Sequence, residues 1–132
     1  MKSVAFSQIV ATQRASYDGG AEVIVGSSKT ARDEILRRVN TAKLPATDVP
    51  IGVFQGEQRT GGYAVQATSI ERRGDELLVH AAFTEPAADG FVTQVITSPA
   101  HVVSVGSTDL TGVKTAVLLD ASGTERARAS LP

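Results

Sequence analysis

The stretch Thr60-Gly61-Gly62-Tyr63 combines the residue types from which a recognition loop can be built. Glycine has no Cβ and adopts positive φ angles at little cost, so an adjacent pair permits a tight loop that another backbone can approach closely. The tyrosine that follows adds a large ring with a polar tip, a side chain that is enriched at the centres of protein interfaces. These residues could therefore bind a protein surface by shape rather than carry out a reaction.

A second interpretation of the same stretch is structural. The glycines would form a hairpin turn between two strands, and the ring of Tyr63 would cover the core. Arg59, just before the loop, would be a charged contact under the first interpretation and a solvated loop residue under the second. The sequence leaves both interpretations open.

A second candidate loop lies further along the chain. Glu85 and Pro86 open a segment that runs to Gly90, and Phe91 follows it. Phe91 is either an anchor for a partner or the first residue of a core strand. The candidate partner-binding residues are therefore Arg59, Thr60, Gly61, Gly62, Tyr63, Glu85, Pro86 and Phe91.

The sequence lacks the motifs of catalysis and metal binding. His80 and His101 are its two histidines, it has no cysteine, and no predicted helix carries the histidine and glutamate spacing of zinc enzymes. No serine lies in a G-x-S-x-G elbow, and residues 26–30 lack the first glycine and the Gly-Lys step of a phosphate loop. We expect no enzymatic activity, no metal and no cofactor. The histidines are expected to sense pH or to hydrogen-bond in the core.

Length and composition narrow the class of protein. The 132 residues predict a single domain over 1–132. A net charge of -1, from 13 basic and 14 acidic residues, argues against nucleic acid as a partner. Residues 1–8 have one basic residue and interrupted apolar residues, which predicts neither a signal peptide nor a membrane span. We therefore expect either a cytoplasmic protein or an exported one whose leader has been removed.

Short apolar runs separated by glycine and proline turns predict a mainly β (α+β) fold. We expect an antiparallel β-sandwich or a strongly bent sheet, with a tail at 121–132 that either frays or adds an edge strand. The predicted strands cover residues 4–14, 21–25, 51–55, 63–71, 76–84, 91–97, 101–105 and 113–120.

One amphipathic helix is predicted from Thr30 to about Thr41. Thr30 would cap it, with Asp33 in the position of a capping-box acid. An apolar stripe predicts that the helix packs on the sheet, and this stripe consists of Ile35, Leu36 and Val39. A loop with two prolines, residues 43–50, would follow.

Several motifs in a fixed order give the chain a family resemblance. The segment 51–65, with its Thr-Gly-Gly-Tyr, is followed by Glu85-Pro86 and then by the run 91–99, which ends in Ser98-Pro99. In this order the motifs resemble the PrcB C-terminal domain family over roughly residues 17–105. The chain departs from the family pattern in Arg59, where the family often has proline, in a helix without tryptophan, and in Ala100, where an aromatic residue is usual.

The resemblance implies a function in which the domain binds another protein. The family is named after an accessory lipoprotein that associates with a subtilisin-like protease, so it implies a bacterial, non-enzymatic accessory module with a protease or other protein as partner. The Thr60–Tyr63 loop is also similar to the loop that chagasin-type inhibitors insert into a cysteine protease. The alternative hypothesis is a structural domain that forms a homo-oligomer by pairing an exposed edge strand with another copy.

Overall fold

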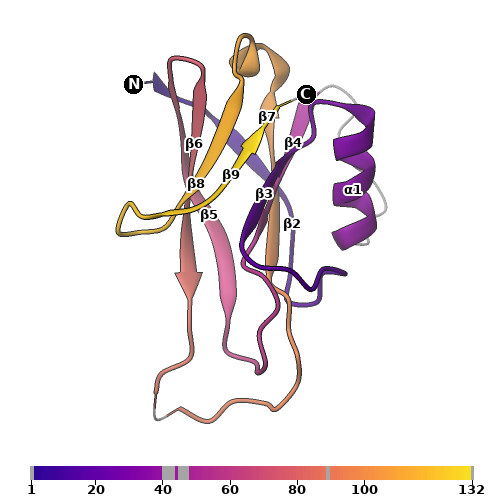
Figure 1. The fold of residues 1–132 in the computed structure, drawn as a ribbon, viewed down its shortest axis with the longest axis vertical. Helices are drawn as coiled ribbons and strands as arrows, with labels where there is room; N and C mark the ends of the chain where they lie inside the picture. The colour runs from indigo at the N-terminus through magenta and orange to yellow at the C-terminus, as the bar shows by residue number, and fades with distance from the viewer. Residues whose placement is uncertain (1, 40–43, 45–47, 89, 132) are drawn as a thin grey trace.

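The computed structural model describes residues 2–39, 44, 48–88 and 90–131, and it is built from two β-sheets packed face to face with a helix on the outside (Figure 1). The strands are β1 (Lys2–Ser3), β2 (Phe6–Thr12), β3 (Glu22–Val25), β4 (Asp48–Phe54), β5 (Ala64–Arg73), β6 (Glu76–Thr84), β7 (Ala100–Gly106), β8 (Thr115–Leu119) and β9 (Glu125–Ser130). The helical elements are α1 (Lys29–Val39) and the short 3₁₀ helix η1 (Ser107–Leu110). The predicted mainly β, sandwich-like α+β class is confirmed.

The chain crosses repeatedly between the two layers. One sheet has five strands in the order β1-β5-β6-β8-β9, and the other has four in the order β2-β7-β4-β3. Most neighbours are antiparallel, as predicted, but β6 and β8 are parallel, with Glu76 opposite Thr115 and His80 opposite Leu119. Parallel neighbours need a crossover connection. Here the chain leaves β6, passes through β7 in the other sheet and returns to β8.

The main core lies between the sheets. Its largest fully buried side chains include Ile51, Ile70, Leu77 and Leu118, which come from β4, β5, β6 and β8. A smaller apolar cluster lies on the other face of the four-stranded sheet, under the helix. The two clusters explain why β4 and β7 are buried along almost their whole length, since each is covered on both faces.

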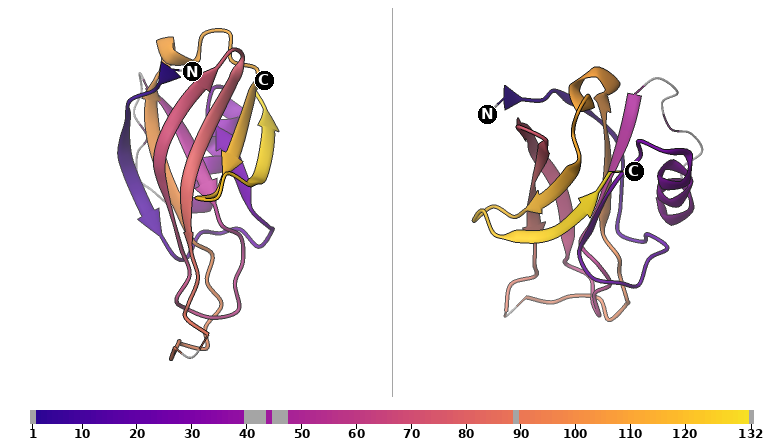
Figure 2. Two further views of the ribbon diagram at one scale, coloured as in Figure 1. Left: turned by 90° about the vertical axis from the view of Figure 1, so that its left-hand side faces the viewer. Right: turned by 45° about the horizontal axis from the view of Figure 1, so that its top comes forward.

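Helix α1 lies on the outer face of the four-stranded sheet, as predicted (Figure 2). Ile35 and Val39 are buried against Phe54 and Val102, while Leu36 is half-buried. The predicted cap is wrong by two residues: the hydroxyl Oγ of Ser28, not that of Thr30, accepts a hydrogen bond from the backbone N–H of Ala31 at 3.2 Å. Thr30 lies inside the first turn of the helix. The predicted end at Thr41 lies outside the described residues.

The predicted strand over residues 4–14 is wrong as a single element, because the chain changes sheet within it. Val4 is buried, and its N–H donates to the carbonyl of Ile70 at 2.8 Å. β1 before it pairs with β5, whereas β2 after it pairs with β7. The blurred alternation of apolar residues in this segment reflects the change of face at Val4 and Ala5.

One further boundary differs from the predictions. β4 begins at Asp48, so Val49 and Pro50 belong to a strand rather than to the predicted loop. Pro50 is tolerated there because the ladder with β3 ends one residue later along β4, at Ile51.

The C-terminal tail forms the edge strand β9, which was one of the two predicted outcomes. The turn before it is built by Asp120, whose Oδ1 accepts hydrogen bonds from the N–H groups of Ser122 and Thr124 at 3.0 Å each. The Ser122 hydroxyl also donates to Oδ1 of Asp120, at 2.6 Å. This bond has the largest effect, and together with the two backbone bonds it lowers the pKa of Asp120 to about 2.

Candidate functional site

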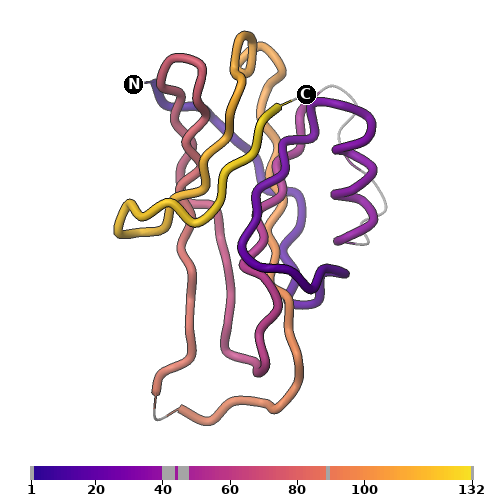
Figure 3. The backbone as a smooth tube through the Cα atoms, in the orientation of Figure 1, coloured from indigo at the N-terminus to yellow at the C-terminus, as the bar shows by residue number. Residues whose placement is uncertain are grey.

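The two loops that the sequence predicted separately lie together at one end of the sandwich. Residues 55–63 join β4 to β5, and residues 85–99 join β6 to β7. Both extend from the end opposite to the β5–β6 turn (Figure 3). We call this end of the molecule, formed by residues 55–63 and the described part of 85–99, the loop end.

Backbone hydrogen bonds join the two loops. Gln58 and Thr97 form a two-way bridge, with N–H to carbonyl distances of 2.8 and 2.9 Å. The N–H of Gly61 donates to the carbonyl of Thr93 at 3.0 Å. The hydroxyl of Thr97, which is buried, donates to the carbonyl of Thr60 at 2.8 Å. The loops therefore form one braced unit rather than two independent tips.

The two glycines contribute to the contact between the loops in different ways. Gly61 is buried under Thr93, and a Cβ at this position would lie 2.4 Å from the Thr93 hydroxyl oxygen. Gly62 has a φ of +90°, and a Cβ there would lie 2.7 Å from Cβ of Pro86. Gly61 thus permits a close approach of the two loops, and Gly62 permits both the turn and the packing of Pro86.

The structure does not support the hairpin interpretation of the Thr60–Tyr63 stretch. The flanking strands β4 and β5 belong to different sheets, so the loop is a crossover between layers. Tyr63 is half-buried, and its carbonyl accepts a hydrogen bond from Nε2 of Gln13 at 3.2 Å.

The other predicted residues differ in exposure. Arg59, Gly62 and Glu85 are exposed, and Thr60 and Pro86 are half-buried. Gly61 is buried, so it holds the loops together and leaves the surface to its neighbours.

The predicted strand over residues 91–97 is wrong. Residues 91–96 form an irregular loop, and Phe91 is fully exposed instead of starting a core strand. Among the described residues, the exposed large hydrophobic side chains are Phe91, Val95 and Ile96, all on this loop. The prediction missed Val95 and Ile96. A signal was present, because the apolar residues at 91, 92, 95 and 96 do not follow the period of two that a half-buried strand requires.

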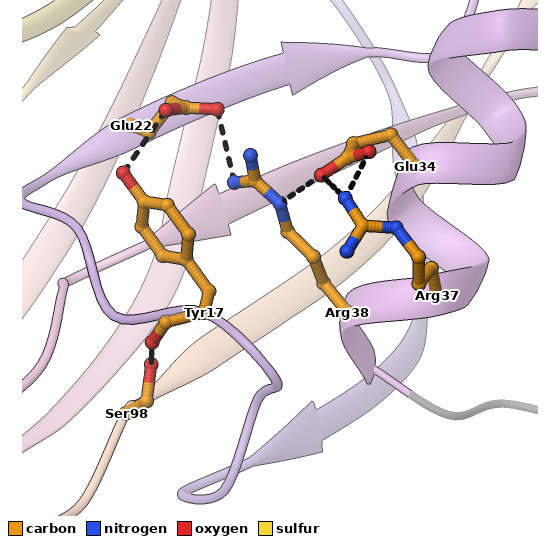
Figure 4. Close-up of polar contacts among 6 residues, drawn as sticks. All are labelled: Tyr17, Glu22, Glu34, Arg37, Arg38 and Ser98. Atoms are coloured by element: carbon orange, nitrogen blue, oxygen red, sulfur yellow. Dashed lines mark hydrogen bonds and ion pairs between the residues drawn. The ribbon is translucent and has the colours of Figure 1, made fainter.

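The base of the 85–99 loop is fixed by the segment that follows β2. The N–H of Ser98 donates to the carbonyl of Gln13 at 2.7 Å, and the N–H of Ala15 donates to the carbonyl of Ser98 at 2.9 Å. The hydroxyl of Ser98 donates to the carbonyl of Tyr17 at 2.7 Å (Figure 4). Ser98 is buried, so these hydrogen bonds are shielded from solvent.

Tyr17 is in turn held by Arg38 of α1, as Figure 4 shows. The Arg38 guanidinium lies 4.0 Å from the centre of the Tyr17 ring and forms ion pairs with Glu22 and Glu34 at 2.9 and 2.7 Å. The Tyr17 hydroxyl donates to Glu22 at 3.0 Å. The pKa of Tyr17 is raised, mainly by burial and next by this hydrogen bond. Bonds from Arg37 and Arg38 lower the pKa of Glu34. This polar cluster joins the helix to the base of the loop end.

The two histidines lie in different sheets. His101 of β7 is buried, and its Nδ1 accepts a hydrogen bond from the N–H of Ala67 in β5 at 2.9 Å. It fills the predicted role of a core hydrogen-bonding residue and joins the two layers. Burial holds the pKa of His101 below its ordinary value of 6.5. His80 of β6 lies 2.8 Å from Glu71. Within the described ranges, no three His, Cys, Asp or Glu side chains gather as a metal ion would need.

These features define a class of protein: a two-layer β domain of the α+β class with a braced pair of loops at one end. Residues 50–106, from β4 through both loops to the end of β7, match the family model described as PrcB C-terminal, which confirms the family resemblance found in the sequence. Comparison with curated proteins and with solved structures gave no match. No helix in the described part of the chain has the length and apolarity needed to span a membrane.

Proposed function

We propose that this domain is a non-enzymatic protein-binding module whose loop end contacts the partner. The observation that carries the proposal is the full exposure of Phe91, with Val95 and Ile96 also exposed on the same loop. Exposed apolar side chains that gather in one place are a mark of interaction sites. Burial of a phenylalanine side chain contributes about 2 to 3 kcal/mol, so Phe91 could act as an anchor.

The bracing of the loops supports the same function. A binding surface that is already ordered loses little conformational entropy when it docks. The bonds of Gly61 and Thr97 to the neighbouring loop hold the backbone on either side of Val95 and Ile96, and the bond at Thr93 lies two residues after Phe91. The groups presented to a partner are backbone atoms, apolar side chains and the separate charges of Arg59 and Glu85, which suit contact rather than bond-making.

We infer from the family that the partner is a protease or a protein associated with one. The PrcB C-terminal segment contains both loops, so the proposed surface lies inside the part of the chain that the family shares. The domain would act as an accessory subunit, and its effect would depend on docking alone.

The proposal is tested by capture from the native host with three immobilised baits: wild type, Phe91→Ser and Asp75→Asn. Asp75 is exposed at the opposite end of the sandwich and serves as the matched control. We expect wild type and Asp75→Asn to recover the same protein, identified by mass spectrometry, and Phe91→Ser to lose it. Equal recovery by all three baits would mean that the loop end is not the binding surface. Light scattering of the purified protein tests the alternative of self-association.

A further inference from the structure

The two open sides of the sandwich differ in how their edge strands are protected. On one side β3 and β9, the edge strands of the two sheets, contact each other. β9 also carries Glu125, Arg126 and Arg128. Charges on an edge strand discourage pairing with another chain. This side is therefore both covered and protected.

The other side is formed by β2 and β5, and the edge of β5 is already engaged. β1 pairs with β5 at Glu71 and Arg72. Nearer the loop end, side chains from the other sheet layer hydrogen-bond the backbone at the edge of β5. Ala67 donates to the buried ring of His101, and the carbonyl of Tyr63 accepts from Gln13. These side chains occupy hydrogen-bonding groups that a neighbouring strand would otherwise use.

The outer edge of β2 has none of the sequence features that protect β9. The segment Phe6–Thr12 has no charged residue, proline or glycine. β2 is the last strand of its sheet, and in the described part of the chain no strand pairs with its outer side (Figure 2, left). Such an edge presents N–H and C=O groups on which an extended segment of another chain can add as a further strand.

A β-bulge in β2 bears on which half of this edge can pair with an added strand, and on whether that strand comes from a second copy or from another protein. The register with β7 shifts between Gln8 and Val10, midway along β2. If two copies paired symmetrically along the whole of β2, their bulges would meet at the centre of the ladder and interrupt it. A symmetric pairing confined to the half after the bulge would join only the three residues Val10–Thr12 of each copy. A segment of a different protein can pair with one half of the strand alone. The geometry therefore favours a foreign segment over a second copy.

The half of β2 that follows the bulge is continuous with the loop end. Gln13, next to Thr12, bonds the base of the 85–99 loop through Ser98. A groove of about 240 Å³ opens between the ends of β2 and β5. Its lining residues are Ala11, Thr12, Gln13, Ala64, Val65 and Ala100. This uncharged lining of mostly small side chains suits an apolar side chain of the added segment.

We propose that the partner adds an extended, uncharged segment to Val10–Thr12 of β2 and places an apolar side chain in this groove. The proposal rests on the proposed function, because it takes the partner to be a protein. It adds a second contact beside the loop end and names the conformation and chemistry of the segment that is bound.

The test uses a displayed library of random linear peptides, selected on the full-length domain. We expect the selected peptides to be uncharged and rich in β-branched residues. Ala11→Lys places a charge in the groove at an exposed position. It is expected to weaken peptide binding by about tenfold or more, because the charge would be buried by the peptide and one or two hydrogen bonds between the peptide and β2 would be lost. Ser7→Lys places the same charge on the same strand before the bulge, also at an exposed position, and is expected to bind as wild type does. Ala11→Thr keeps the edge uncharged and is also expected to bind.

Hydrogen exchange of the complex should show new protection of those amides of Val10–Thr12 that point away from β7. A library that yields no binder, or binders that are insensitive to Ala11→Lys, would overturn the proposal. So would a wild-type dimer that Ala11→Lys converts to a monomer, since the occupant would then be a second copy. Phe91→Ser is expected to leave peptide binding unchanged, so the outcome for the edge of β2 can be told apart from the outcome for the loop end.

Discussion

At the end of the sandwich where β1 starts, β5 and β6 are joined by the short turn at Gly74 and Asp75, whereas at the loop end long loops connect strands of different sheets. The short turn is polar: Arg73 and Glu76 form an ion pair at 2.8 Å, and Arg72 donates to the carbonyl of Gly74 at 2.9 Å. The loop end instead places its hydrogen bonds inside and its apolar side chains outside. The two ends therefore differ in more than loop length, because the loop end combines hydrogen bonds between its loops with exposed apolar side chains. We propose that this combination makes it the binding surface.

The largest contrast in stability is expected between glycines at the two ends. Gly62→Ala should destabilise the fold by roughly 2 to 4 kcal/mol, because the φ angle is unfavourable and the new Cβ meets Pro86. Gly74→Ala, with a φ of +62° and no atom within 4 Å, should cost about 1 kcal/mol. Urea unfolding curves measure both. Equal losses would show that the Gly62–Pro86 packing contributes nothing.

The largest effect on binding is expected at Phe91. Phe91→Ser should weaken binding of the captured partner by roughly 2 kcal/mol, which is about thirtyfold, as for an interface anchor. Because the ring is fully exposed, the free energy of unfolding should change by no more than about 0.5 kcal/mol. Calorimetric titration and thermal unfolding give the two numbers. A variant that loses stability but keeps its affinity would assign Phe91 to the fold instead.

The brace between the loops gives a smaller effect. Thr97→Val removes the bond from a buried hydroxyl to the Thr60 carbonyl and should cost about 1 to 2 kcal/mol, with faster amide exchange in residues 58–61. Thr68→Val is the matched control, because the Thr68 hydroxyl bonds the carbonyl of His80 at 3.2 Å on the exposed surface. That change should stay within about 0.5 kcal/mol. Similar losses in the two variants would argue against a special role for the brace.

The smallest effect concerns pH and His101. Because burial lowers the pKa of His101 in the folded state, the unfolded chain binds a proton that the folded chain does not. Stability should therefore fall as the pH drops below the ordinary histidine pKa of 6.5, by at most about 1.4 kcal/mol per pH unit, until the folded pKa is reached. Unfolding at several pH values should show this slope in wild type and in His80→Gln, and its loss in His101→Gln. A slope that follows His80 would contradict the assignment.

Much of the fold could be predicted because its signals are local. Ile35 and Val39 lie at helical spacing, and Gly74 with Asp75 marks a tight turn between alternating strands. The change of sheet at Val4 could not be predicted, because it depends on a bond to the distant carbonyl of Ile70. The parallel pairing of β6 with β8 likewise depends on the path through β7.

The sequence singled out some residues of the candidate site, but neither Val95 and Ile96 nor the arrangement of the loops. The glycine pair and Phe91 could be singled out by residue type. Nothing local indicates that Gly61 lies under Thr93, or that residues 91–96 lack a partner strand. Loop contacts between distant parts of a chain are set by tertiary packing, so the sequence left the two loops separate.

The most direct test of the braced loop end is the hydrogen-exchange footprint of the partner recovered from the native host. We predict that amides of residues 60–63 and of residues 90–96 become protected together on binding. Protection of one loop without the other, or of the β5–β6 turn instead, would contradict the claim that the two loops act as one binding surface.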